Sequence, residues 1–205
     1  MEIDFLKFPK ASRTRVSTEK ARKIARKFGR EFFDGSRENG YGGYKYDGRW
    51  KPVAKRLIDH YGLEQWDRVL DVGCGKGFLV KDLMNAGVPA YGIDVSEYAI
   101  GKTVVPCVEV GNAKKIAFDD KAFSLAVSIN TIHNLPEPEC REALRELTRV
   151  SDAQYVVLDA YRTAAQKKRI FEWNLTAQTI LSVDEWLKLF RKVGYKGDYS
   201  WTVMN

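Results

Sequence analysis

The 205-residue chain predicts an α/β fold: a doubly wound, mostly parallel sheet of six or seven strands, preceded by an N-terminal helical lid. One run, VLDVGCGKGFLVKDLMNAGVPAYGID from Val69 to Asp94, predicts strand, glycine turn, helix and strand, which is a complete βαβ unit. Further short apolar strands alternate with helical periodicity after it. We expect a basic arm and lid over residues 1–66 and an α/β core over residues 67–205.

The N-terminal part carries the positive charge of the chain. Residues 1–60 hold 16 Lys or Arg against 8 Asp or Glu, whereas residues 61–205 hold 18 against 19. This asymmetry indicates either an anionic partner, such as a nucleotide, a phosphorylated sugar or nucleic acid, or a solvated basic helix face. We expect a loosely ordered arm over residues 1–16 and one amphipathic helix from Thr18 to Phe33.

A loop rich in glycine and aromatic residues follows, from Asp34 to Pro52, and leads to a second amphipathic helix over 53–61. Aromatic faces contact cations, and Arg or Lys side chains bind anions, so the pattern predicts a binding loop. A loop fixed to the core by its aromatic residues is the alternative. The candidate substrate-binding residues here are Tyr41, Lys45, Tyr46, Arg49 and Trp50.

The turn that follows the first strand, 68–71, contains Gly73, Gly75 and Gly77 and opens a helix over 78–86. Glycines let the backbone pass close to a ligand, and the turn amides favour anionic groups. Asp94 ends the next strand, where it can accept hydrogen bonds from both hydroxyls of a ribose. The spacing departs from the dinucleotide fingerprint and from the P-loop. A nucleoside-bearing cofactor is therefore predicted.

The motif D-V-G-C-G-x-G, preceded by Val69 and Leu70, closely resembles motif I of the class I S-adenosylmethionine (SAM) dependent methyltransferases. The resemblance implies a Rossmann-like fold, SAM as cofactor and methyl transfer as the activity. A glycine turn that merely connects strand to helix is the alternative, as is a small buried filler for Cys74. The cofactor-binding residues that the resemblance implies are Asp71, Gly73, Cys74, Gly75, Gly77, Asp94, Val95, Asn112, Ala113 and Asn130.

Later segments resemble the same family. After a short helix over 97–101 and a strand over 104–110, Asn112 stands where the family usually has an acid that bonds the adenine amino group. A fourth strand, 124–129, ends at a loop that should face the transferring methyl. His133 in this loop is the candidate general base, with Tyr44 and Tyr46 as alternatives, and a structural histidine is the competing expectation.

The C-terminal third continues the alternation of helices and strands. Asp159 ends a fifth strand, and the adjacent Tyr161 and Arg162 are candidate acceptor contacts. Ser182 and Glu185 form a capping box that opens a helix ending at Gly194. The remaining elements are expected over 138–150 (helix), 155–158 (strand), 164–176 (helix), 178–181 (extended) and 199–204 (strand), which leaves room for one terminal strand where the family usually has two.

The expected activity is transfer of a methyl group to a hydroxyl of a small anionic acceptor. The segment YGGYKYDGRW is loosely similar to small methyltransferases of bacterial surface-polysaccharide or capsule modification, which implies a nucleotide-linked or phosphorylated sugar. An RNA, DNA or other N-directed methyltransferase is one alternative, although INTIHN lacks the Asn/Asp-Pro-Pro-aromatic motif of enzymes that methylate base amino groups. A non-catalytic SAM-binding module is another.

Composition narrows the remaining classes. No apolar run approaches the roughly 20 residues needed to span a bilayer, and the first ten residues have no apolar signal-peptide core, so a cytoplasmic protein is expected. Cys74, Cys107 and Cys140 lack C-x-x-C spacing, which indicates reduced thiols and no metal site. No pattern in the sequence indicates an oligomeric state.

Overall fold

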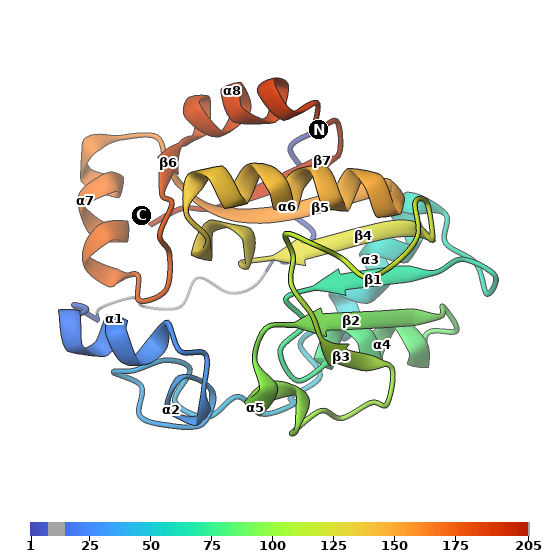
Figure 1. Ribbon diagram of the computed structural model, residues 1–205, viewed down its shortest axis with the longest axis horizontal. Helices are drawn as coiled ribbons and strands as arrows, with labels where there is room; N and C mark the ends of the chain where they lie inside the picture. Colours follow the sequence, from blue (N-terminus) through green and yellow to red (C-terminus); the bar gives the residue numbers. More distant parts are fainter. Residues whose placement is uncertain (8–14, 205) are drawn as a thin grey trace.

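The computed structural model describes residues 1–7 and 15–204 and contains a seven-stranded sheet (Figure 1). The strand order is β3-β2-β1-β4-β5-β6, with β7 paired to β5. Every pairing between these strands is parallel, so the predicted doubly wound sheet is confirmed with seven strands. The strands are β1 (Val69–Val72), β2 (Ala90–Asp94), β3 (Val108–Val110), β4 (Phe123–Ile129), β5 (Ser151–Tyr161), β6 (Leu181–Ser182) and β7 (Asp198–Thr202).

Helices cover both faces of the sheet, because the central strands are apolar on both sides. Helices α3 (Lys51–Tyr61) and α4 (Phe78–Asn85) pack on one face. Helices α6 (Glu137–Val150) and α8 (Val183–Val193) pack on the other face (Figure 1). The result is a three-layer α/β/α architecture, in agreement with the prediction.

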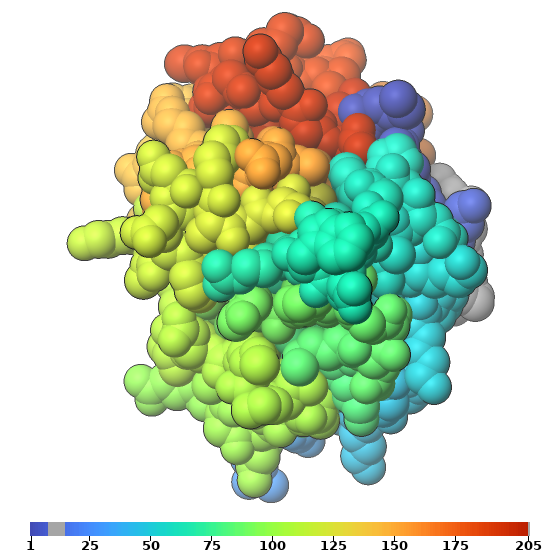
Figure 2. Space-filling view, turned by 90° about the vertical axis from the view of Figure 1, so that its right-hand side faces the viewer, coloured from blue at the N-terminus to red at the C-terminus, as the bar shows by residue number. Residues whose placement is uncertain are grey.

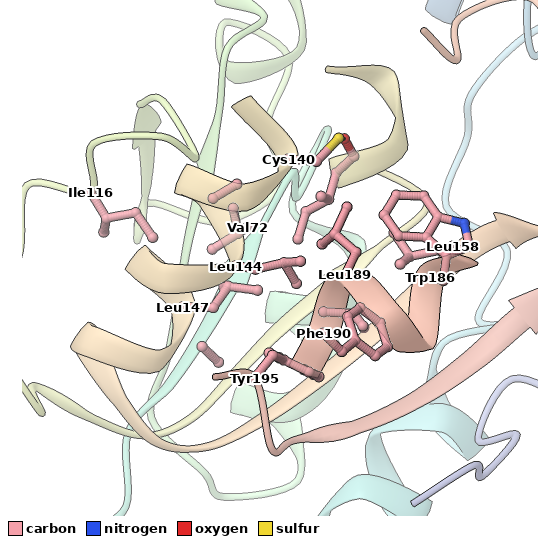
Figure 3. Close-up of a cluster of buried hydrophobic side chains, with 14 of the residues drawn as sticks. Val72, Ile116, Cys140, Leu144, Leu147, Leu158, Trp186, Leu189, Phe190 and Tyr195 are labelled. Atoms are coloured by element: carbon pink, nitrogen blue, oxygen red, sulfur yellow. The ribbon is translucent and has the colours of Figure 1, made fainter. Parts of the chain in front are cut away.

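The face under α6 and α8 holds the larger apolar cluster (Figure 3). Leu144 and Leu147 of α6 are fully buried, and so is Trp186 of α8. Phe190 stacks on Trp201 of β7, with ring centroids 5.9 Å apart. This packing fixes α8 against the C-terminal strand, while the capping box of Ser182 and Glu185 defines where α8 begins.

The carboxyl ends of the parallel strands meet at one edge of the sheet, where α1 (Glu19–Ala25) and α2 (Arg30–Phe33) lie close to α7 (Ala164–Trp173) (Figure 1). The short α5 (Glu97–Ile100) and the 3-10 turn η1 (Ile132–Asn134) follow β2 and β4 at the same edge. Figure 2 shows the opposite side of the molecule, where the connections that enter the strands form the surface. Ligand-binding side chains are therefore sought at the edge near α1 and α2.

The expectation of one continuous helix from Thr18 to Phe33 is wrong. The chain forms α1 and α2 with a break between them, because Phe28 adopts a left-handed φ of 49° and Gly29 is extended. The apolar spacing continues through the break, so periodicity alone could not reveal it.

The N-terminal arm is also more ordered than expected over residues 1–7. The amide of Ile3 donates a hydrogen bond to the carbonyl oxygen of Tyr199 at 2.8 Å. Phe5 is 5% exposed and packs edge-on against the ring of Tyr155. The rest of the arm up to residue 14 lies outside the described residues.

Three other element boundaries differ from expectation. Strand β5 is longer than the predicted 155–158, β3 is shorter than 104–110, and α7 ends at Trp173 instead of residue 176. Among the described helices, none is long and apolar enough to cross a membrane.

Replacing Leu144 with Ala should destabilise the fold by about 2–5 kcal/mol, because the side chain is fully buried between α6 and the sheet and its removal leaves a cavity. Leu187 on α8 is only partly buried, so Leu187→Ala should cost clearly less. Urea unfolding of both variants measures the two losses. Equal losses would contradict this assignment of the core.

Candidate cofactor and acceptor site

The glycine turn after β1 curls back onto β2. The amides of Gly73 and Cys74 donate hydrogen bonds to the carbonyl oxygen of Ile93, at 2.7 and 3.1 Å. Gly73 has a φ of +88°, and a Cβ there would lie 1.9 Å from the Oγ1 atom of Thr131. Gly75 and Gly77 also have positive φ. Side chains are therefore excluded from a turn that presents bare backbone to the carboxyl edge.

Asp94 at the end of β2 holds this turn in place. Its Oδ2 atom accepts a hydrogen bond from the Gly75 amide and its Oδ1 atom accepts one from the Ser96 amide, each at 2.8 Å. Burial raises the pKa of Asp94, although the two amide bonds act in the opposite direction. The two carboxylate oxygens keep lone pairs for a further donor, as binding to a ribose requires.

Asp71 at the end of β1 is a buried carboxyl, 5% exposed. Within residues 1–7 and 15–204, no hydrogen-bond donor reaches it. Burial, together with the negative charge of Asp94, raises the pKa of Asp71 to about 8. A buried carboxyl of this kind favours a ligand that brings its own positive charge.

Aromatic side chains of the segment between α2 and α3 cover the turn. A Cβ at Gly75 would lie 3.2 Å from the Tyr44 ring and 3.5 Å from the Phe33 ring. The Tyr44 ring also stacks on Phe78, with centroids 4.7 Å apart, and contacts Tyr41 at 4.5 Å. The lid, which we define as residues 28–50, thus closes directly onto the glycine turn.

A buried ion pair fixes the lid to the turn. Lys76, between the second and third glycines, is 7% exposed, and its Nζ atom lies 2.8 and 2.7 Å from the two carboxylate oxygens of Asp34. The hydroxyl of Tyr98 donates a hydrogen bond to the same carboxylate, as does the amide of Tyr44. Sequence analysis missed both charged residues, and a lysine between the glycines beside an aromatic loop was the signal available.

The lid tyrosines remain neutral phenols near pH 7. The phenolic oxygen of Tyr41 is surrounded although 43% of the residue is exposed, and burial with the charge of Asp94 raises its pKa to about 12. Burial also raises the pKa of Tyr44 well above its usual value. Tyr46 donates a hydrogen bond to Asp82 at 2.5 Å, which raises its pKa to about 12. These shifts disfavour Tyr44 and Tyr46 as bases, contrary to the expectation for Tyr44.

His133 lies in η1 and is 3% exposed. Its Nδ1 atom accepts a hydrogen bond from the Asp159 amide at 3.0 Å, which places the imidazole proton on Nε2, 3.4 Å from the Asp159 carboxylate. Burial lowers the pKa of His133. Both ring nitrogens are therefore engaged, and the geometry corresponds to the structural alternative for this histidine, not to a general base.

Other predicted cofactor residues divide into two groups. Cys74 points into the core against Gly92, as the filler alternative expects. Asn130 has a left-handed φ of 55°, and its Oδ1 atom accepts a hydrogen bond from Thr202. Asn112 accepts one from the Lys114 amide, which leaves its amide group for a ligand. Val95 is 60% exposed beside Asp94, and Ala113 is half-buried.

The predicted substrate residues are dispersed by their partners. The guanidinium of Arg49 pairs with Asp47 at 2.5 Å, yet it lies close enough to Tyr41 and Tyr44 to be felt by both phenols. Lys45 is exposed and Trp50 is half-buried at the start of α3. Tyr161 donates a hydrogen bond to Glu185, and Arg162 pairs with Glu2. Only Tyr41 and Arg49 of this set border the glycine turn through the lid.

Comparison with known proteins identifies the glycine-turn region. The protein family described as "Methyltransferase domain" matches residues 70–168, which include the turn, Asp94 and the loop after β4. The chain contains a class I, SAM-dependent methyltransferase domain. A SAM-dependent methyltransferase from Archaeoglobus fulgidus shares its fold, with a TM-score of 0.57 and 18% identity over 72% of this chain and 69% of that chain.

Curated relatives match the same methyltransferase domain. A ubiquinone biosynthesis O-methyltransferase of Paraburkholderia phymatum is 31% identical over 96 residues, 42% of this chain and 41% of that protein. An uncharacterized protein of Methanocaldococcus jannaschii is 33% identical over 105 residues, 51% of this chain and 41% of that protein. The chain thus spans about two fifths of the length of these relatives.

The residues of the methyltransferase domain fit SAM. The unpartnered Asp71 carboxyl suits the cationic amino group of the cofactor, and the Asp94 carboxylate suits the hydroxyls of its ribose. The bare backbone of the turn permits close approach of a ligand once the Tyr44 and Phe33 rings move. When bound, SAM supplies an activated methyl group.

Replacing Asp34 with Asn should destabilise the fold by about 1–3 kcal/mol, because it leaves the buried Lys76 without its charge partner. The loss falls below that of a fully buried pair since the Asp34 side chain is 27% exposed. Asp59→Asn breaks the exposed pair with Lys55 and should cost about 0–1 kcal/mol. Chemical denaturation compares the two, and similar costs would show that the lid pair is not special.

The raised pKa of Asp71 predicts a pH dependence of stability. Between the unfolded value of about 3.9 and the folded value of about 8, the folded protein binds a proton that the unfolded chain has released. This contribution therefore weakens the cofactor-free fold as pH rises through that window. Asp71→Asn should gain stability relative to wild type between pH 5 and pH 8.5 in urea titrations. A constant difference between the two proteins would refute the shifted pKa.

Proposed function

We propose that the protein transfers the methyl group of SAM to a hydroxyl of a small anionic acceptor. The observation that carries this proposal is the pairing of the glycine turn with two buried carboxyls, Asp71 and Asp94, at the carboxyl edge of the sheet. The methyltransferase domain match and the printed O-methyltransferase activity of the Paraburkholderia relative support a hydroxyl acceptor. A phosphorylated or nucleotide-linked sugar, as in polysaccharide biosynthesis, belongs to this class.

Asp159, and not His133, is the proposed proton acceptor. The charges of both Asp94 and Asp159 act on the phenol of Tyr41, so the two carboxylates border the same space. One oxygen of Asp159, Oδ2, accepts a hydrogen bond from Asn174 and faces His133. Its Oδ1 atom accepts none from the described residues. His133 and Asn174 therefore orient Asp159, whose second oxygen can take the proton of an attacking hydroxyl.

The lid completes the site. Its Tyr41 and Tyr44 phenols are neutral donors that can orient the acceptor oxygen, and the rings exclude water from the turn. Because the Tyr44 ring lies directly over Gly75, the lid has to open for the cofactor to enter. The Asp34–Lys76 pair holds the closed arrangement, so residues 1–66 serve as the proposed gate.

Substituting Asp94 tests the cofactor site. Asp94→Ala removes the carboxylate that bonds the ribose hydroxyls and should weaken binding of S-adenosylhomocysteine on the order of 100-fold, because two charge-assisted hydrogen bonds are lost. Asp152→Ala is the matched control, since this exposed aspartate lies at the amino end of β5. Calorimetric titration measures both affinities. Unchanged binding in Asp94→Ala would overturn the site.

Methyl uptake tests the activity itself. The protein is incubated with SAM labelled in its methyl group and with phosphorylated sugars, nucleotide sugars or hydroxylated aromatic acids as acceptors. Label should appear in one of these classes, and Asp159→Asn should lower kcat while the affinity for S-adenosylhomocysteine stays within about twofold. Transfer to RNA or DNA, with none to small acceptors, would replace this proposal with a nucleic-acid methyltransferase.

A further inference from the structure

A second binding feature lies beside the cofactor site, in a cavity of about 500 Å³. Helix α1 forms one wall through Arg22 and Arg26, and the segment after α7, residues 174–181, forms the wall opposite. Phe171, Ala177, Ile180 and Leu181 add apolar surface. The cavity therefore combines two cations with an apolar lining.

The two arginines have no carboxylate partner among the described residues. Arg22 donates to the carbonyl oxygens of Phe171 and Asn174 and to the Ser17 hydroxyl, all of which are neutral. Arg26 donates one hydrogen bond, to the carbonyl oxygen of Ala177 at 3.0 Å. The remaining N–H groups of Arg26 bond no other described residue. Glu137, which also lines the cavity, is paired with Arg141.

The wall of the cavity is joined to the edge where β4 and β5 end. The amides of Gln178 and Thr179 each donate a hydrogen bond to the carbonyl oxygen of His133 at 3.0 Å. The side chain of Asn174 bonds the Asp159 carboxylate from the same segment. A molecule seated in the cavity thus has one end at the arginines and the other beside Asp159.

We propose that this cavity binds the acceptor, with a carboxylate or phosphate group held by Arg22 and Arg26 and an apolar body against Phe171 and Ile180. Two guanidinium groups, one of them with free donors, match a planar carboxylate or a phosphate. The placement explains the positive charge of the N-terminal part by a specific site on α1. It deepens the proposed function and rests on it.

The test uses the protein saturated with S-adenosylhomocysteine and two probes, 4-hydroxybenzoate and phenyl phosphate, with phenol as their uncharged counterpart. Two-dimensional NMR of the ¹⁵N-labelled wild type should show shifts of amides in residues 174–181 with both anions and weaker shifts with phenol. Arg26→Gln should weaken anion binding about tenfold, which corresponds to one charge-assisted contact. Lys20→Gln removes one charge from the exposed side of α1 and should change nothing.

Three outcomes are distinguishable. Cofactor binding that stays intact, with shifts confined to the lid or equal affinity in Arg26→Gln and Lys20→Gln, overturns the cavity and leaves the methyltransferase proposal standing. Loss of S-adenosylhomocysteine binding in the wild type overturns the proposed function instead. Because the wild-type shift map locates the probes without any substitution, a variant that fails to fold does not prevent the decision.

Discussion

The site depends on the Asp94 carboxylate, which binds two backbone amides that come from different elements. One amide belongs to Gly75 in the turn after β1, and the other belongs to Ser96, which caps α5 after β2. These bonds set the position of the turn against β2, and the parallel pairing of the two strands places Asp71 at the same edge. The strand register thus brings together the carboxyls that a nucleoside with a cationic group requires.

The lid is built on this turn as a second layer. Lys76 is part of the turn and buried, so its charge requires a partner, and Asp34 supplies one from the lid. The aromatic rings of Phe33, Tyr41 and Tyr44 then shield the pair and the bare glycine backbone from water. Cofactor entry and lid opening are therefore coupled, because the same rings cover the space that the ligand has to reach.

Sequence reasoning identified what local pattern determines. The glycine turn, Asp94 and the capping box of Ser182 with Glu185 all lie within short segments whose chemistry is visible in the residue order. It failed where distant contacts decide. Asp34 and Lys76 are 42 positions apart, and their pairing has no periodic signal. Strand β5 was predicted too short because its first turn of sequence is polar, yet Gln154 is buried and bonds the carbonyl oxygen of Ser151.

The central claim is that the turn between β1 and α4 accepts the methionine-bearing nucleoside of SAM and not a dinucleotide. Calorimetric titration of the wild-type protein with S-adenosylhomocysteine and, in parallel, with NAD at the same protein concentration tests it most directly. The account predicts saturable binding of S-adenosylhomocysteine and no heat from NAD. Binding of NAD alone would contradict the role of the glycine turn, and with it the roles assigned to Asp71, Asp94 and Asp159.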